Sequence, residues 1–250
     1  MPVFTYGIEP VTDHPRHAGR GDSVHNHLMS TLSAAFVRLH ARLAPVAFVP
    51  EVRLHQADEP IGLWELTEGE FRSDRPPPFW AFAWAGGQGL ARYVTDHPEV
   101  VAGRRVLDLA SGSGLVAIAA ARAGAAAVRA VEVDELAVAA VALNAEANGV
   151  RVDAELGDIL DGDAGDAEVI LAGDVFYSGA MANRVVRFLL RATRAGASVL
   201  VGDPGRAFLP RERFAELASY DVPVSEALES VQVKRTTVWR LRAGRPETAD

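Results

Sequence analysis

The chain has 250 residues, 49% of them hydrophobic and 23% charged, as in one large globular domain rather than a disordered or fibrous chain. It lacks cysteine, which excludes disulfides, thiolate nucleophiles and cysteine-bound metal. The formal net charge of −8 argues against non-specific binding to nucleic acid, because that binding needs clustered positive charge. Lys234 is the single lysine among 25 basic residues, which we attribute to coding bias.

The N-terminal region begins without periodicity, so we expect residues 1–22 to form a tail. A helix is predicted from Ser23 to Ala44, and Pro45 is expected to end it. Apolar residues three and four apart define the face that this helix should bury: Leu28, Leu32, Ala35, Phe36, Leu39 and Leu43.

Two shorter elements are expected next. Pro50 to His55 is typical of a short extended segment. Pro60 to Phe71 predicts a short strand-and-helix segment in which Trp64 and Leu66 are buried. A rigid proline run follows at 76–78.

Beyond the proline run, apolar segments alternate with helical patterns. The predicted strands are Val106–Ala110, Ala127–Val133, Val150–Leu156, Glu168–Ala172 and Ser198–Gly202. The predicted helices are Leu115–Ala123, Glu135–Ala147, Gly179–Ala192 and Pro210–Ser219. Two further extended stretches are expected at Val222–Leu228 and Arg235–Leu241.

This alternation predicts an α/β fold with a doubly wound, mostly parallel sheet, because the strands are too continuously apolar to be half exposed. The last two extended stretches suggest an antiparallel hairpin at the sheet edge. We expect residues 76–245 to form the main domain and residues 1–75 to pack on it as a tail and helical extension.

A glycine-rich loop joins the first predicted strand to the first predicted helix, running from Asp108 to Leu115 with the sequence DLASGSGL. In a doubly wound sheet, ligands bind beside this turn. Gly112 and Gly114 allow the backbone to approach a ligand, and Ser111 lies between them and the strand. Such a loop alone is weak evidence, since many folds use one merely to turn.

Three acids narrow the ligand. Asp108 would repel a pyrophosphate on the loop but suits a cationic amine. Glu132, which ends the second strand, is placed to accept hydrogen bonds from both ribose hydroxyls. Asp158 could accept from an adenine amino group, or could simply be a turn residue. A dinucleotide site would share Glu132 but usually has glycine at position 117, which is alanine here. The acids therefore favour a nucleoside that bears an amino acid, such as S-adenosylmethionine.

Aromatic residues gather before the first strand. Trp80 and Trp84 are expected to pack over a sulfonium, since a ring face attracts a cation. Alternatively, they are core residues that join the N-terminal extension to the domain.

Four separated motifs carry a family resemblance: Pro77-Pro-Phe-Trp-Ala before Trp84-Ala-Gly-Gly, Asp174-Val-Phe-Tyr177, Asp203-Pro-Gly-Arg206 and Thr236-Thr-Val-Trp239. With these motifs the chain, from about Phe36 to Leu241, resembles the electron transfer flavoprotein β-subunit lysine methyltransferase family. These are class I, seven-β-strand, Rossmann-like enzymes. The chain departs from the family pattern at Glu132, where aspartate is commoner.

The resemblance implies an S-adenosylmethionine-dependent protein-lysine N-methyltransferase, with the electron transfer flavoprotein β subunit as its substrate. It implies that Asp174 orients the incoming amine and that Tyr177 forms part of the lysine channel. Asp203 and Arg206 would lie near the target-binding edge, although Asp-Pro-Gly is also a common turn. Another protein, such as a ribosomal protein, or a small-molecule amine remains an alternative substrate. A non-catalytic nucleotide-binding module is the alternative of a different class.

No metal is expected. Five of the seven histidines lie in the first 40 residues, mostly in or near the predicted tail: His14, His17, His25, His27 and His40. Metal sites usually draw their ligands from several fixed elements, so these histidines do not predict one. We further expect a monomer without a nucleic-acid or membrane partner. We expect a cytoplasmic location, since the chain begins without a signal segment.

Overall fold

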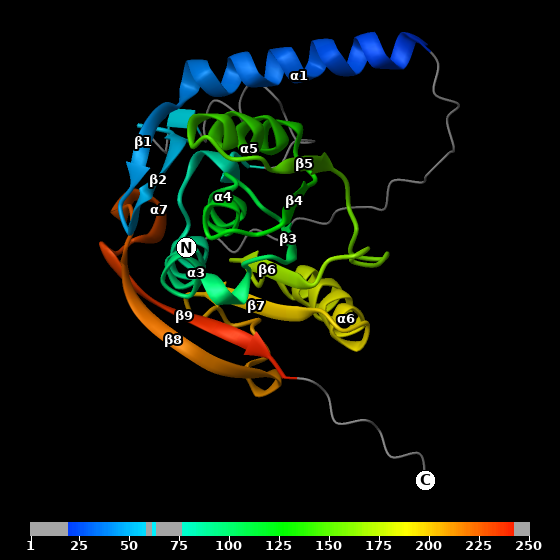
Figure 1. Cartoon of the computed structure of the whole chain (residues 1–250). Helices are drawn as coiled ribbons and strands as arrows, with labels where there is room; N and C mark the ends of the chain where they lie inside the picture. Colours follow the sequence, from blue (N-terminus) through cyan, green and yellow to red (C-terminus); the bar gives the residue numbers. More distant parts are fainter. Residues whose placement is uncertain (1–19, 59–61, 64–76, 243–250) are drawn as a thin grey trace.

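The computed structural model describes residues 20–58, 62–63 and 77–242. Its main feature is a seven-stranded sheet with the order β5-β4-β3-β6-β7-β9-β8 (Figure 1). The parallel strands are β3 (Arg105–Leu109), β4 (Ala127–Glu132), β5 (Asp153–Leu156), β6 (Val169–Gly173) and β7 (Ser198–Asp203). An antiparallel pair, β8 (Phe214–Pro223) and β9 (Val233–Leu241), completes the sheet. The predicted doubly wound fold with a C-terminal hairpin is confirmed.

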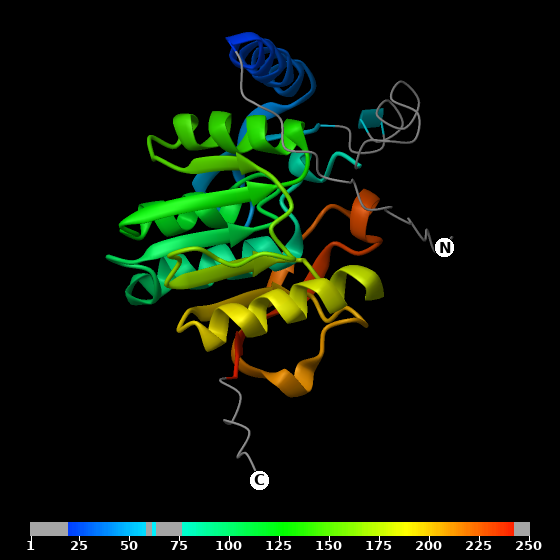
Figure 2. The ribbon, with the colours of Figure 1, turned by 90° about the vertical axis from the view of Figure 1, so that its right-hand side faces the viewer.

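Helices cover both faces of this sheet, as Figures 1 and 2 show. On one face lie α3 (Ala85–Asp96), α4 (Leu115–Arg122) and α5 (Glu135–Ala147). On the other lies α6 (Gly179–Arg194), and the segment 157–167 completes that side by adding Leu160 and Ala164 to the core. The central strands are therefore buried on both faces, which explains their continuous apolar sequences.

The predicted helix Pro210–Ser219 is wrong. The structure has a short 3-10 helix, η3 (Arg211–Arg213), followed at once by β8. The predicted extended stretch Val222–Leu228 holds only the end of β8, and the short helix α7 (Glu226–Glu229) follows. The reason is pairing, because β8 forms an antiparallel ladder with the next strand, β9, which is interrupted by one irregularity between Glu216 and Ala218.

The first helix, α1 (Arg20–His40), ends earlier than predicted. Pro45 does not end it but lies in β1 (Arg42–Val46), which pairs antiparallel with β2 (Val49–Gln56) in a separate two-stranded sheet. A proline is tolerated there because β1 is an edge strand.

The predicted buried face of α1 is wrong at Leu32, Ala35 and Leu39, although Phe36 packs against the core. Leu32 and Leu39 are 56% and 78% exposed, whereas Val37 and Ser33 are buried. Helix α1 packs against α5, and that contact selects a stripe different from the one with the most leucines. Of the expected segment Pro60–Phe71, the structure describes residues 62–63, where Leu63 is buried, whereas Trp64 and Leu66 lie outside the described residues. Within the described part of the chain, no helix is long and apolar enough to cross a membrane.

Strand β2 is tied to the main domain through Asn144 of α5 and Asn148, which caps the end of that helix. Asn144 is fully buried, and its side chain accepts from the His55 backbone N–H at 2.8 Å and donates to the Ser113 carbonyl at 2.8 Å. Asn148 exchanges hydrogen bonds with the backbone of Arg53. Because Ser113 belongs to the glycine-rich loop, Asn144 connects the N-terminal extension directly to that loop.

Candidate functional site

The glycine-rich loop lies at the carboxyl end of β3, where α4 begins. Gly112 has φ +55° and Gly114 has φ +81°, in the left-handed region that favours glycine. A Cβ on Gly114 would lie 3.2 Å from Val141 of α5, so this glycine also permits close packing. A Cβ on Gly112 would meet no atom within 4 Å, so the loop faces open space there.

Asp108 is buried behind this loop, with 1% of its surface exposed. Its Oδ2 accepts a hydrogen bond from the Ser111 hydroxyl at 2.5 Å and another from the Ala117 backbone N–H at 3.0 Å. Burial raises the pKa of Asp108 to about 7, although these two hydrogen bonds oppose the shift. The structure thus brings the predicted residues Asp108 and Ser111 together, with the carboxyl group bracing the loop from within.

Glu132, at the end of β4, contacts the front of the same loop. Its Oε1 accepts from the Gly112 N–H at 2.8 Å and its Oε2 from the Val133 N–H at 2.9 Å. Burial raises the pKa of Glu132 as well. Val133 and Leu156 follow or end neighbouring strands and are 58% and 50% exposed. Val133 and Leu156 were not singled out from the sequence, where their only signal is their position at the ends of two strands.

Asp158 is placed differently from the other acids. Its Oδ1 accepts from the Leu160 N–H at 3.0 Å in a turn, and its Oδ2 pairs with Arg184 of α6 at 2.8 Å. Arg184 also pairs with Asp161 at 2.6 Å. The turn alternative thus describes part of its role in this structure, while its proposed contact with adenine stays a prediction.

The two tryptophans differ in how far they are buried. Trp80 is fully buried in the cluster that joins α1 to α5, so the core-residue alternative describes its position. Trp84 precedes α3, donates its Nε1–H to the Phe79 carbonyl at 2.9 Å, and packs edge-on against Phe79 and Phe82. Of the two, Trp84 has a partly exposed surface that a ligand could contact.

Asp174 follows β6 and adopts φ +60°, a left-handed conformation that aspartate tolerates better than most residues. Its backbone N–H donates to the Gly202 carbonyl at 2.9 Å. Its Oδ2 accepts from the Gly87 N–H at 2.7 Å, and its Oδ1 pairs with Arg206. Gly87 lies in the first turn of α3, where backbone N–H groups lack partners within the helix. Asp174 therefore caps the start of α3 from a distant part of the chain.

Glycines make this approach of α3 to the strand ends possible. A Cβ on Gly173 would lie 2.9 Å from the Gly87 Cα, and a Cβ on Gly202 would collide with the carbonyl oxygen of Gly86. The backbones of α3, β6 and β7 thus touch without intervening side chains. This close contact fixes where the Asp174 carboxylate lies.

Asp203 and Arg206 form the turn that follows β7. Asp203 is fully buried, and its Oδ1 accepts from the Gly205 and Arg206 N–H groups, both at 2.7 Å. The Arg206 side chain reaches back to Asp174, with Nη1 3.8 Å from Asp203 Oδ2. The sequence left a turn and a place at the target edge as alternatives, and the structure combines a turn with a contact to Asp174.

Three exposed aromatic side chains, which we call the aromatic rim, lie near this edge: Phe79, Tyr177 and Phe208, with exposures of 38%, 52% and 49%. The rings of Phe79 and Tyr177 lie 6.2 Å apart. Phe208 lies beside Gly179, at the start of α6. Partial burial, and then the charge of Glu132, raise the pKa of Tyr177, so its hydroxyl stays protonated near neutral pH.

Comparisons with known proteins agree with this arrangement. The model of the ribosomal protein L11 methyltransferase family (PrmA) matches residues 94–193. An electron transfer flavoprotein beta subunit lysine methyltransferase from Danio rerio is 38% identical over 200 residues, covering 78% of this chain and 77% of the relative. Its counterpart from Xenopus laevis is 33% identical and covers 84% and 87%.

The chain belongs to the electron transfer flavoprotein beta subunit lysine methyltransferase family. It is therefore a methyltransferase. Among solved structures, a proposed RNA methyltransferase from Pyrococcus horikoshii matches with a TM-score of 0.50 at 17% identity, covering 70% of this chain and 95% of that one. That likeness concerns the fold alone.

In this methyltransferase, the contacts of Asp174 could not be foreseen from its motif. The motif marks Asp174 and Tyr177, but the Gly87 N–H is 87 positions away and Arg206 is 32 positions away. The sequence signal was the glycine pair Gly86-Gly87 in the motif Trp84-Ala-Gly-Gly, but the helix α3 that contains it was not predicted.

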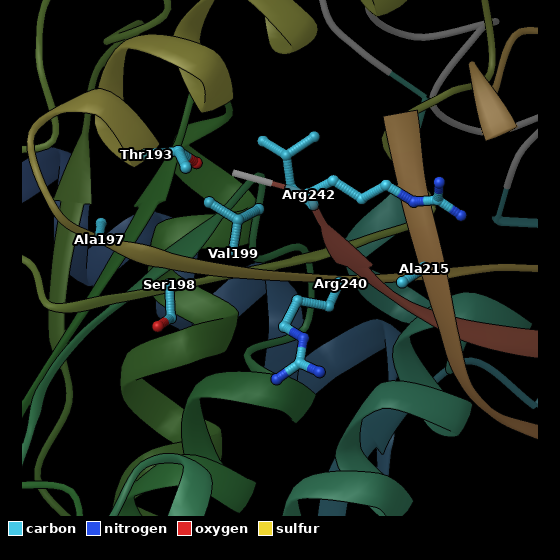
Figure 3. A pocket seen from close by; sticks show the side chains of 8 residues that line it. Thr193, Ala197, Ser198, Val199, Ala215, Arg240 and Arg242 are labelled. Atoms are coloured by element: carbon cyan, nitrogen blue, oxygen red, sulfur yellow. The ribbon is translucent and has the colours of Figure 1, made fainter. Parts of the chain in front are cut away.

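A hollow elsewhere on the molecule does not belong to this site. It has a volume of about 410 Å³ and lies between the end of α6, the start of β7 and the end of β9 (Figure 3). Ser198 lines it, whereas Asp203 stands at the opposite end of the same strand. In the part of the chain that the structure describes, no group of three or more His, Asp or Glu residues is arranged to hold a metal.

The raised pKa of Asp108 predicts how stability changes with pH in the ligand-free methyltransferase. The pKa is about 7 when folded and about 3.9 in an unfolded chain, so the folded state binds the proton more tightly between these values. The stability that this proton binding contributes is fully present below about pH 4 and is lost as the pH rises through about 7. Denaturant midpoints of the wild type and Asp108→Asn, measured from pH 5 to 8, should show the variant gaining relative stability as the pH rises. The raised pKa of Glu132 acts in the same direction in both proteins. The dependence of stability on pH should therefore be weaker in Asp108→Asn than in the wild type, but not absent. Parallel profiles would contradict this role for Asp108.

Proposed function

We propose that this protein transfers a methyl group from S-adenosylmethionine to lysine side chains of the electron transfer flavoprotein β subunit. The observation that carries the proposal is the position of Asp174, at the carboxyl edge of the sheet that also holds the glycine-rich loop and Glu132. The same substrate is named for the relatives from Danio rerio and Xenopus laevis.

The residues at the sheet edge fit S-adenosylmethionine. Gly112 faces open space, so a ligand can approach its backbone. Glu132 accepts from backbone N–H groups and retains lone pairs for two ribose hydroxyls. Val133 and Leu156 offer exposed apolar surface that suits a flat base. When bound, the cofactor supplies an electrophilic methyl group, whose bond to sulfur breaks as the bond to nitrogen forms.

Protein side chains then have to prepare the amine. A free lysine has a pKa of about 10.4, so only a small fraction is neutral at pH 7. Asp174 would accept a hydrogen bond from the amine and so direct the lone pair of the amine nitrogen at the methyl carbon. This role is positioning rather than strong base catalysis. The proton of the entering ammonium leaves to water. The aromatic rim would enclose the aliphatic stem of the lysine and exclude water from the reacting atoms.

Labelling tests this function directly. The protein is incubated with labelled S-adenosylmethionine and a cell lysate, with and without recombinant electron transfer flavoprotein, and the labelled band is identified. We expect label on lysines of the flavoprotein β subunit, and labelling about 100-fold slower or more with Asp174→Asn. Label on another protein would refute the specific substrate and retain the class. Ribosomal protein L11 is a control acceptor, because the PrmA model matches part of the chain.

Calorimetry separates the remaining alternatives. Binding of S-adenosylmethionine with no binding of NAD is expected, whereas the reverse would favour a nucleotide-binding module. Label confined to small molecules would favour a small-molecule amine as the acceptor. A monomeric state, a cytoplasmic location and the absence of nucleic-acid and membrane partners stay predictions.

A further inference from the structure

Charged side chains from four segments form a connected group that includes Asp174. Arg206 pairs with Asp174, lies near Asp203, and is also stabilised by the charge of Glu229 in α7. Glu229 in turn pairs with Lys234 of β9, the single lysine of the chain. We call these five residues the charge cluster. It contains three carboxylates and two cations and therefore carries one net negative charge. One further positive charge, or a neutral hydrogen-bond donor, can be accommodated there.

Two buried carboxylate oxygens of the charge cluster lack hydrogen-bond partners, Asp203 Oδ2 and Glu229 Oε1. A buried oxygen without a donor is costly and needs an explanation. Arg206 Nη1 lies 3.8 Å from Asp203 Oδ2, so a movement of about 1 Å would make a hydrogen bond. The Arg206 backbone is held by Asp203 Oδ1, and therefore only its side chain has to move.

The proposed reaction favours such a movement. Asp174 Oδ2 accepts from the Gly87 N–H and Oδ1 from Arg206, so a lysine amine that shares Oδ1 would lie directly against the guanidinium. If Arg206 turned toward Asp203, it would free Oδ1 and still remain beside the amine. A like charge at a distance of about 4–6 Å disfavours the ammonium form and so lowers the pKa of an amine. Tyr177 adds no charge near neutral pH, because its pKa is raised.

We propose that Arg206 is a positioning residue for methyl transfer: it moves from Asp174 to Asp203 when the target lysine enters, and its charge favours the neutral amine over the ammonium. This inference rests on the proposed lysine methylation. It assigns opposite tasks to two neighbours, since Asp174 orients the amine while Arg206 offsets the tendency of that carboxylate to retain the ammonium. Asp203 supplies the second position of the guanidinium.

The test compares steady-state methylation of the recombinant flavoprotein β subunit by four variants from pH 6.5 to 9.5. Arg206→Gln should lower kcat about tenfold at pH 7.5 without raising KM, because an unshielded Asp174 attracts the ammonium. Its rate profile should move about one unit toward alkaline pH. Arg206→Lys keeps a cation and should retain the wild-type profile. Asp203→Asn should instead raise KM about tenfold, since Arg206 then stays on Asp174.

Arg213→Gln is the matched control, because Arg213 is half exposed and, among the residues that the structure describes, pairs with Glu212 alone, at 4.0 Å. It should behave as wild type, and thermal unfolding should show all variants folded. An unchanged pH profile in Arg206→Gln, or a loss of kcat and rise of KM together, would overturn the role of Arg206 alone. A wild-type enzyme that methylates no amine acceptor would overturn both this inference and the proposed function.

Discussion

Replacing Asp174 with asparagine is expected to lower kcat/KM for the protein acceptor by about 100-fold or more, because a misplaced amine loses its in-line approach. Asparagine tolerates φ +60°, and its amide oxygen can still accept from the Gly87 N–H. It removes the charge that orients the amine and pairs with Arg206. Alanine is a poorer test, since it would also leave the Gly87 N–H and Arg206 without their partner.

Binding of S-adenosylmethionine should change less than about threefold in Asp174→Asn, because the hydrogen bonds of Asp174 go to α3 and Arg206 rather than to the glycine-rich loop. Asp161→Asn is a suitable control, because this exposed carboxylate pairs with Arg184 away from the charge cluster. Calorimetry and steady-state rates provide the two measurements. Wild-type turnover in Asp174→Asn would show that another group positions the amine.

The second large effect is expected from Gly202→Ala. The added Cβ would collide with the Gly86 carbonyl and lie 2.9 Å from the Leu90 Cβ, so α3 and β7 must separate. Overpacking of this kind costs about 1 to 3 kcal/mol. In a chain of this size, each kcal/mol lowers the Tm by about 2 to 4 °C, so we expect the Tm to fall by about 2 to 12 °C. Turnover should fall too, because the Gly202 carbonyl holds the Asp174 N–H.

Gly162→Ala makes the same chemical change where space exists. Its Cβ would lie 3.5 Å from the Ile159 carbonyl oxygen, an ordinary contact. Scanning calorimetry should place this control within about 0.5 kcal/mol of the wild type. If Gly202→Ala unfolded at the wild-type temperature, the close contact between α3 and β7 would not be essential for the fold.

The sequence determined those features whose causes lie close together along the chain. The apolar run of β6 and the start of α5 at Glu135 follow from neighbouring residues, and both were predicted within a residue or two. The glycine-rich loop and the acid at Glu132 could be found because their spacing reflects a single strand-turn-helix unit. Asp174 could be found because its motif marks the end of a strand.

Tertiary structure alone decided the features that depend on pairing or packing with another element. β8 is a strand because β9 supplies its hydrogen bonds, although its own residues also suit a helix. The buried stripe of α1 was selected by contact with α5, and it leaves Leu39 exposed.

The same distinction holds within the site. The sequence identified Asp174 as a candidate, but the fold determined that Gly87 and Arg206 hold its two oxygens. It also determined that Asp108 braces the loop from behind, with a pKa near 7. Local patterns specify which residue types are present at a strand end. Burial and hydrogen bonding between distant segments decide which charges they carry and which atoms they face.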